Sequence, residues 1–129
     1  MSPSDHLLAS TARWTAAVRA QESAREDRLF NDPWAAALAG PEGAAWIEQR
    51  PPGSTVPMVL RTRFFDDFVQ RIAAEDGIRQ IVLMAAGLDT RAFRLSWPKV
   101  TRFFELEQPA VLRYKDQVLT SAGAQPACA

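Results

Sequence analysis

The segment Ile81–Arg91 constrains the fold more than any other part of the sequence. It begins with the apolar run Ile81–Met84, which is followed by the small residues Ala85–Gly87 and then by a more polar stretch. An unbroken apolar run is typical of a strand buried in a parallel sheet, and the residues after it favour a tight turn and a helix start. In open α/β folds, small molecules bind where such strands end. We therefore expect a ligand at this turn.

Composition excludes several classes of function. The formal net charge of zero argues against a nucleic-acid-binding surface. Cys128 is the only cysteine and His6 the only histidine, so we expect neither an internal disulfide nor a protein-ligated zinc site. No apolar run approaches the ~20 residues of a membrane helix, and residues 1–5 lack the features of a signal peptide. The sequence therefore predicts a cytoplasmic protein without a membrane partner.

The remaining pattern predicts helices followed by strand, helix, strand and helix, which is the order of a parallel α/β fold. We expect a loose tail over residues 1–9 and strands over 80–84 and 101–106. One helix begins at Ser10, and a second begins at Asp32–Pro33 and ends at Gly40–Pro41, with a short helical turn possible at 44–47. Further helices are expected over 57–75, over 90–95 and from Pro109 onward. The helix over 57–75 carries an apolar stripe, Leu60, Phe64, Phe68 and Ile72, which we expect to cover the sheet.

Two strands rarely make a stable sheet, and both strands read as buried. The sheet therefore needs further strands, either from another chain or, as we favour, from the rest of a longer protein. An open sheet edge and uncovered apolar faces would also favour self-association.

Glu107 is the second indication of a ligand site. It follows the second strand, twenty positions after Gly87. Dinucleotide-binding folds place an acid at about this distance from their glycines, where its carboxylate accepts hydrogen bonds from ribose hydroxyls. Glu105 should face the same way, but Glu107 lies nearer the carboxyl end of the strand. The alternatives are a solvated acid at Glu107 and a turn whose small residues only allow close helix packing.

The turn and a nearby arginine indicate which ribose-bearing ligand fits. A nicotinamide dinucleotide brings a pyrophosphate, which the methyl groups of Ala85 and Ala86 would obstruct. S-adenosyl-L-methionine carries a carboxylate instead, which calls for an arginine or a helix N-terminus. Arg61 and Arg63 lie early in the helix before the strand, and either could reach the site, although we interpret Arg63 as a surface residue. A nicotinamide-dependent oxidoreductase domain and an inactive fragment or assembly module remain the alternatives.

Three segments closely resemble the leucine carboxyl methyltransferase family: residues 58–66, 82–95 and 104–111. Leu29–Pro33 is also similar to the N-terminal region of that family, which includes actinobacterial methyltransferases and polyketide O-methyltransferases. The resemblance covers about residues 10–125. It implies a class I, Rossmann-like methyltransferase fold with a seven-stranded sheet. This chain would hold a helical cap over 1–56 and the start of the S-adenosyl-L-methionine-binding α/β domain over 57–129.

The resemblance also implies site residues. Arg61 matches the arginine that holds the methionine carboxylate, Ala85, Ala86 and Gly87 match the turn under the cofactor, and Glu107 matches the ribose-binding acid. The family often has glycine in place of Ala85 and usually aspartate in place of Glu107. The implied reaction is methyl transfer to a carboxylate or hydroxyl of a small molecule or protein C-terminus. No residue of this chain suits the role of a catalytic base, so none is assigned.

Overall fold

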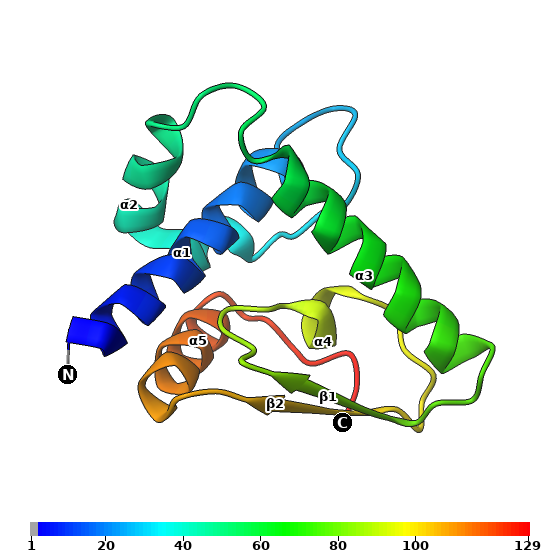
Figure 1. Ribbon diagram of the computed structural model, residues 1–129. Helices are drawn as coiled ribbons and strands as arrows, with labels where there is room; N and C mark the ends of the chain where they lie inside the picture. Colours follow the sequence, from blue (N-terminus) through cyan, green and yellow to red (C-terminus); the bar gives the residue numbers. More distant parts are fainter. Residues whose placement is uncertain (1–2) are drawn as a thin grey trace.

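The computed structural model describes residues 3–129, except the side chains of residues 4, 5, 7 and 8 (Figure 1). The elements are α1 (Pro3–Ser23), α2 (Ala35–Glu48), α3 (Val56–Ala74), β1 (Gln80–Met84), α4 (Arg91–Arg94), β2 (Arg102–Leu106) and α5 (Pro109–Ser121). Helices therefore precede a strand-helix-strand-helix unit, as the sequence pattern predicts.

The start of α1 corrects the prediction of a loose tail over residues 1–9. Residues 1 and 2 lie outside the described part of the chain, but the helix already includes Pro3 and continues through His6. Proline suits a first helical turn, and a helix whose later turns are packed extends by one hydrogen bond for each added residue. Ala16 and Ala17, which are fully buried beneath α2, provide that packing.

The two described strands pair side by side and in parallel, as expected. Val82 lies opposite Phe104, and Met84 lies opposite Leu106. On the other edge of β2, the N–H of Phe103 donates to the carbonyl of Ala129 at 2.8 Å. The N–H of Ala129 donates in turn to the carbonyl of Thr101 at 3.3 Å. The last residue of the chain therefore lies against the edge of β2 that β1 leaves free.

The region of α2 contains a break at the position where the sequence predicts a helix end. Gly40 has φ 61° and ψ −171°, which glycine adopts readily. The helix then resumes at Pro41 and continues to Glu48, further than the short turn expected at 44–47. Before the helix, the N–H of Trp34 donates to Oδ1 of Asp32 at 3.0 Å, as predicted for Asp32, but the helix begins only at Ala35, with Trp34 as its N-cap residue in place of Asp32.

The main core lies between the helical cap and α5, next to the turn after β1. Its buried members come from α1, α2, α5 and the connecting segments: Ala16, Ala17, Leu38, Ala39, Leu88, Val111, Leu119 and Ala124. A smaller cluster joins Val18, Phe30 and Val59. The main core joins the cap to α5 and to the segment after β1, near the carboxyl end of the strands where the sequence places a ligand, and the smaller cluster joins the cap to α3.

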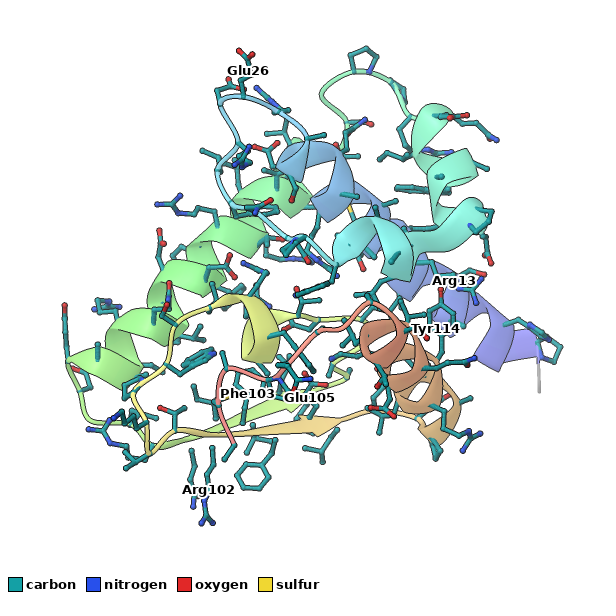
Figure 2. The ribbon with its side chains drawn as sticks, turned by 180° about the vertical axis from the view of Figure 1, so that it is seen from behind. Arg13, Glu26, Arg102, Phe103, Glu105 and Tyr114 are labelled. Carbon is teal, nitrogen blue, oxygen red and sulfur yellow. The ribbon has the colours of Figure 1, made fainter. Side chains whose placement is uncertain are left out.

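One face of the sheet is bare, which contradicts the prediction that both strands are buried. Val82, Met84, Phe104 and Leu106 share this face and are exposed, Met84 by 75%. Figure 2 shows Phe103 and Glu105 on the side of the strands that faces α5, and Arg102 on the opposite side. Among residues 3–129, no element packs over that opposite side, because α4 and α5 both lie on the other face (Figure 1).

The apolar stripe of α3 does not cover the sheet. Leu60, Phe64 and Phe68 are exposed, Phe64 by 64%, so this prediction is also wrong. Helix α3 runs at an angle above the strands and approaches β1 only near its own C-terminal end (Figure 1). No described helix has both the length and the apolar composition needed to cross a membrane.

Candidate ligand-binding cleft

The turn after β1 has the unusual backbone that a sharp reversal requires. Ala85 and Gly87 both have φ of 53°, in the left-handed region that side chains other than glycine rarely adopt. Between them, the N–H of Ala86 donates to the carbonyl of Leu106 at 3.1 Å. This bond extends the pairing of β1 and β2 into the turn, so the turn backbone is held at the carboxyl ends of both strands.

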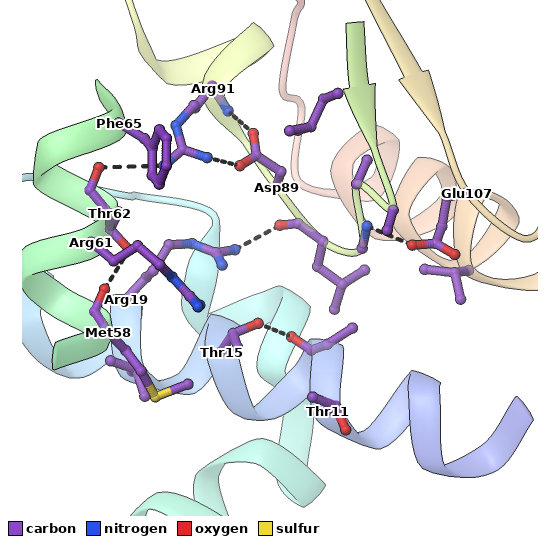
Figure 3. A pocket seen from close by; sticks show the side chains of 18 of the residues that line it. Thr11, Thr15, Arg19, Met58, Arg61, Thr62, Phe65, Asp89, Arg91 and Glu107 are labelled. Carbon is purple, nitrogen blue, oxygen red and sulfur yellow. Dashed lines mark hydrogen bonds and ion pairs between the residues drawn. The ribbon is translucent and has the colours of Figure 1, made fainter. Parts of the chain in front are cut away.

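Glu107 reaches back to this turn from the end of β2. Its Oε2 accepts a hydrogen bond from the N–H of Gly87 at 2.8 Å (Figure 3). Its Oε1 accepts one from the N–H of Gln108 at 2.7 Å. A carboxylate offers about four acceptor positions, so two bonds leave capacity for a ligand. The extra methylene of glutamate, compared with aspartate, is used to span the gap between the strand ends.

Arg61 enters the same space from α3. Its side chain extends beside Arg19, which comes from α1 (Figure 3). Among residues 3–129, the guanidinium of Arg61 has no recorded hydrogen bond or ion pair with a protein group. Arg63 differs, because it pairs with Asp67 at 2.9 Å and lies outside the cavity. The sequence left open whether Arg61 or Arg63 reaches the site, and in the structure only Arg61 of the two lines the cavity.

One cavity of about 610 Å³ brings together all the residues that the sequence predicts for the site. Arg61, Ala85, Ala86, Gly87 and Glu107 line it. Sequence reasoning missed the other side of the cavity, which α1 and α3 form with Thr11, Thr15, Val18, Arg19, Met58, Thr62 and Phe65. Those from α1 lie outside the segments that resemble the family and those from α3 lie within residues 58–66, but only the packing of the two helices brings either set to the turn.

A second hollow of about 680 Å³ adjoins the first between α1 and α5. The two share Ala12, Leu88, Gln108 and Val111 as lining residues. On the wall of the second hollow, the Arg13 guanidinium lies 4.5 Å from the centre of the Tyr114 ring (Figure 2). Figure 2 places both residues at the end of the molecule where α1 meets α5.

A buried network of charged side chains connects the cap to the segment that follows the turn. Asp32, whose side chain is fully buried, accepts hydrogen bonds from Nε of Arg19 at 2.9 Å and from Oγ1 of Thr90 at 2.6 Å. Arg19 also donates to the carbonyl of Leu88 at 2.6 Å. A buried charge is tolerated when it is paired and hydrogen-bonded, as these are. The network ties the segment after Gly87 to the cap.

Glu105 lies on the same side of the sheet as Glu107 but has a different partner. Its Oε2 accepts a hydrogen bond from Nζ of the buried Lys115 at 2.5 Å, while its Oε1 is buried with no described partner. Burial raises the pKa of the Glu105 carboxyl above its ordinary value, although the Lys115 ammonium opposes this shift. Glu105 does not line the cavity, which agrees with the preference for Glu107.

These residues fit the end groups of a sulfonium nucleoside. Arg61, which pairs with no acid in the part of the chain that the structure describes, offers a cation for a carboxylate, and Glu107 offers acceptors for hydroxyls. The turn is closely covered, since a Cβ built on Gly87 would lie 3.6 Å from Cβ of Ala12. No group of three or more histidine, cysteine or acidic residues among the described residues is arranged to hold a metal ion.

Comparison with known proteins identifies the family. The family model described as leucine carboxyl methyltransferase matches residues 12–129. A relative from Frankia alni is 50% identical over 125 residues, which cover 88% of this chain and 43% of the relative. A relative from Parafrankia sp. is 47% identical over 129 residues, and one from Saccharopolyspora erythraea is 43% identical over 131 residues; each alignment covers 92% of this chain.

Each of these relatives carries the name "Putative S-adenosyl-L-methionine-dependent methyltransferase". The chain spans 41% to 44% of the length of these curated relatives. The matched residues include the turn, Glu107 and Arg61, which the fold brings to one cavity. Because the family model matches nearly the whole chain, the chain belongs to the leucine carboxyl methyltransferase family.

Proposed function

We propose that this chain is the cofactor-binding N-terminal part of an S-adenosyl-L-methionine-dependent O-methyltransferase with a class I, Rossmann-like fold. The observation that carries the proposal is the arrangement of the 610 Å³ cavity. The guanidinium of Arg61 and the carboxylate of Glu107 line the same space as the left-handed turn at Ala85–Gly87. This is the set of groups that a ligand with a carboxylate and a ribose requires.

The residues of the chain would hold the cofactor at separate points. Arg61 would bind the methionine carboxylate with charge-assisted hydrogen bonds, and Glu107 would accept hydrogen bonds from the ribose hydroxyls. Thr11, Thr15 and Phe65 would cover the ligand from α1 and α3, which limits access of water. When bound, the cofactor supplies an activated methyl group, so the protein contributes mainly binding and alignment of the acceptor oxygen.

The acceptor we propose is a carboxylate or hydroxyl of a small molecule or protein C-terminus. A carboxylate acceptor needs no general base, whereas a hydroxyl usually does. The acids that line the cavity are engaged in other bonds: Asp89 pairs with Arg91, and Glu107 accepts two backbone N–H groups. Within residues 3–129 the chain therefore favours a carboxylate acceptor. We also propose a cytoplasmic location with neither nucleic-acid nor membrane partners.

Calorimetry with S-adenosylhomocysteine and with NAD tests the proposal. We expect binding of S-adenosylhomocysteine and none of NAD, because the Ala85 and Ala86 methyl groups stand where a pyrophosphate would need close contact with the backbone. The comparisons do not favour the oxidoreductase alternative. Binding of NAD alone would replace the proposal, and binding of neither ligand would favour an inactive fragment or assembly module.

A further inference from the structure

We propose that Asp66, with Arg91 and Arg94, acts as a clamp that positions Arg61 relative to the turn at Gly87. The inference rests on the proposed function, since it assigns positioning residues to the same cofactor site. Asp66 itself does not line the cavity. It would act on the ligand only through the placement of α3.

The clamp is centred on a buried carboxylate. Asp66 Oδ1 accepts hydrogen bonds from Nε of Arg91 and from Nη2 of Arg94, each at 2.8 Å, and Oδ2 accepts one from Nη1 of Arg94 at 2.7 Å. The Asp66 side chain is only 4% exposed. Two-pronged arginine–carboxylate contacts are directional, so they fix the orientation of the groups that they join.

Arg91 links the two elements that form opposite sides of the cavity. Its Nη2 donates to the carbonyl of Thr62 in α3 at 3.3 Å, and its Nη1 pairs with Asp89 in the turn (Figure 3). Thr62 is the neighbour of Arg61, and Asp89 lies two residues after Gly87. A single guanidinium therefore connects the backbone beside Arg61 to the segment beside Gly87.

Apolar packing holds this half of α3 to the cap through Val59, but it does not join it to the strands. The stripe of α3, Leu60, Phe64 and Phe68, points into solvent and buries little surface against the strands. The other recorded polar tethers of α3 to the α/β part lie nearer its C-terminal end, from Gln70 to the carbonyl of Ser96 and from Arg79 to the carbonyl of Ala73. The clamp therefore joins the half of α3 that carries Arg61 to the segment after the turn, while Val59 packs that half against Val18 and Phe30 of the cap.

The test compares Asp66→Asn with Asp67→Asn in the whole 129-residue chain. Asp67 is the matched control, because it is the next residue of α3 and pairs on the exposed side with Arg63. The probes are S-adenosylhomocysteine and 5′-methylthioadenosine, which keeps the ribose but lacks the amino-acid end. We expect Asp66→Asn to weaken S-adenosylhomocysteine roughly 10-fold or more and to weaken 5′-methylthioadenosine much less. Asp67→Asn should change neither affinity.

A double variant separates positioning from a general loss of structure. If Asp66 acts through Arg61, Asp66→Asn should cost little further affinity once Arg61 has been replaced by alanine. Equal losses for the two probes, no loss at all, or fully additive effects would overturn the inference. If Asp66→Asn fails to fold, Arg91→Lys tests the same prediction and should change the two affinities in the same way. Lysine keeps the positive charge, but it lacks the planar guanidinium that contacts both the Thr62 carbonyl and Asp89.

Hydrogen exchange measures the clamp without any ligand. Asp66→Asn should speed exchange in residues 58–66 and 86–90 and leave α5 unchanged. Should the unmodified chain bind neither probe, the proposed function fails, and the exchange pattern decides the positioning role by itself. Unchanged exchange in both segments would then overturn the clamp, and faster exchange confined to them would support it.

Discussion

The N–H of Gly87 donates a hydrogen bond to Oε2 of Glu107 at 2.8 Å, and thereby joins the ends of β1 and β2 across twenty positions of sequence. This contact places the ribose-binding acid of our proposal directly at the turn. The resemblance to the family implies an aspartate at this position, and the contact shows how the longer glutamate side chain is accommodated. The longer side chain folds back and holds the turn with one oxygen and the N–H of Gln108 with the other.

Glu107→Ala should weaken S-adenosylhomocysteine binding by about 1.5–3 kcal/mol, because charged hydrogen bonds to the ribose would be lost. Titration calorimetry measures this change. Glu26→Ala is the control, because Glu26 is exposed and lies far from the site. Figure 2 shows it at the opposite end of the molecule from Glu105, which is two residues before Glu107 in the sequence. An unchanged affinity in Glu107→Ala would remove this residue from the site.

Arg61→Ala should weaken S-adenosylhomocysteine by about 1.5–3 kcal/mol and should not affect 5′-methylthioadenosine, which has no carboxylate. Arg63→Ala provides the comparison on the same helix, because Arg63 pairs with Asp67 outside the cavity. The same calorimetric titrations report both variants. If Arg63→Ala instead gave the selective loss, the assignment of the carboxylate-binding arginine would pass to Arg63.

Asp32→Ala should lower the free energy of unfolding by roughly 3–5 kcal/mol, because it leaves the buried Arg19 guanidinium without its carboxylate. Urea denaturation followed by circular dichroism measures the loss. Asp27→Ala is the control. It removes an ion pair with Arg25 at the surface, where the Asp27 side chain is 77% exposed, and should not change the free energy of unfolding measurably. Similar stabilities for the two variants would contradict the role given to the network.

Cys128 should react slowly with iodoacetamide in the folded protein. Burial raises the pKa of its thiol above the ordinary 9.0, and the nearby Glu105 charge adds to the shift. At pH 9 the folded chain therefore holds less thiolate than the unfolded chain, and alkylation should be faster in urea. The same shift means that this thiol contributes stability that is lost as the pH rises above 9.0 through the higher folded-state pKa.

Mass spectrometry follows this reaction without ambiguity, since the chain has one cysteine. Glu105→Gln should speed the reaction of the folded protein by removing the negative charge. Equal alkylation rates with and without urea would show that the C-terminal segment does not shield the thiol.

Met84→Lys should reduce self-association of the chain. Met84 belongs to the bare apolar face of the sheet with Val82, Phe104 and Leu106, and such surfaces promote contacts between molecules. Sedimentation velocity over a range of concentrations measures the change. Gln80→Lys adds the same charge to the same face of β1 without removing an apolar side chain, so it should have a smaller effect. Identical profiles for the two variants would point to net charge rather than to this face.

Local sequence patterns were sufficient for the order of the elements, for the bounds of several of them and for the turn. The strand predicted over residues 80–84 matches β1, and the helix predicted over 57–75 differs from α3 by one residue at each end. These features depend on neighbours in sequence: an apolar run, small residues and helix-compatible periodicity. The spacing of Gly87 and Glu107 also indicated that they would meet, because parallel strands joined by a crossover end at one edge.

Contacts between distant segments decided the rest. Nothing local predicts that Asp32 accepts a hydrogen bond from Thr90, or that Arg91 joins Asp66 in α3 to Asp89 in the turn. The stripe of α3 has the periodicity of a buried face, yet whether it is covered depends on which elements pack against it. The sequence by itself determined the order of elements and the turn at the strand end. Only the tertiary structure decided which charges are buried, which apolar faces stay bare and how Arg61 faces the turn, because these depend on the packing of the cap.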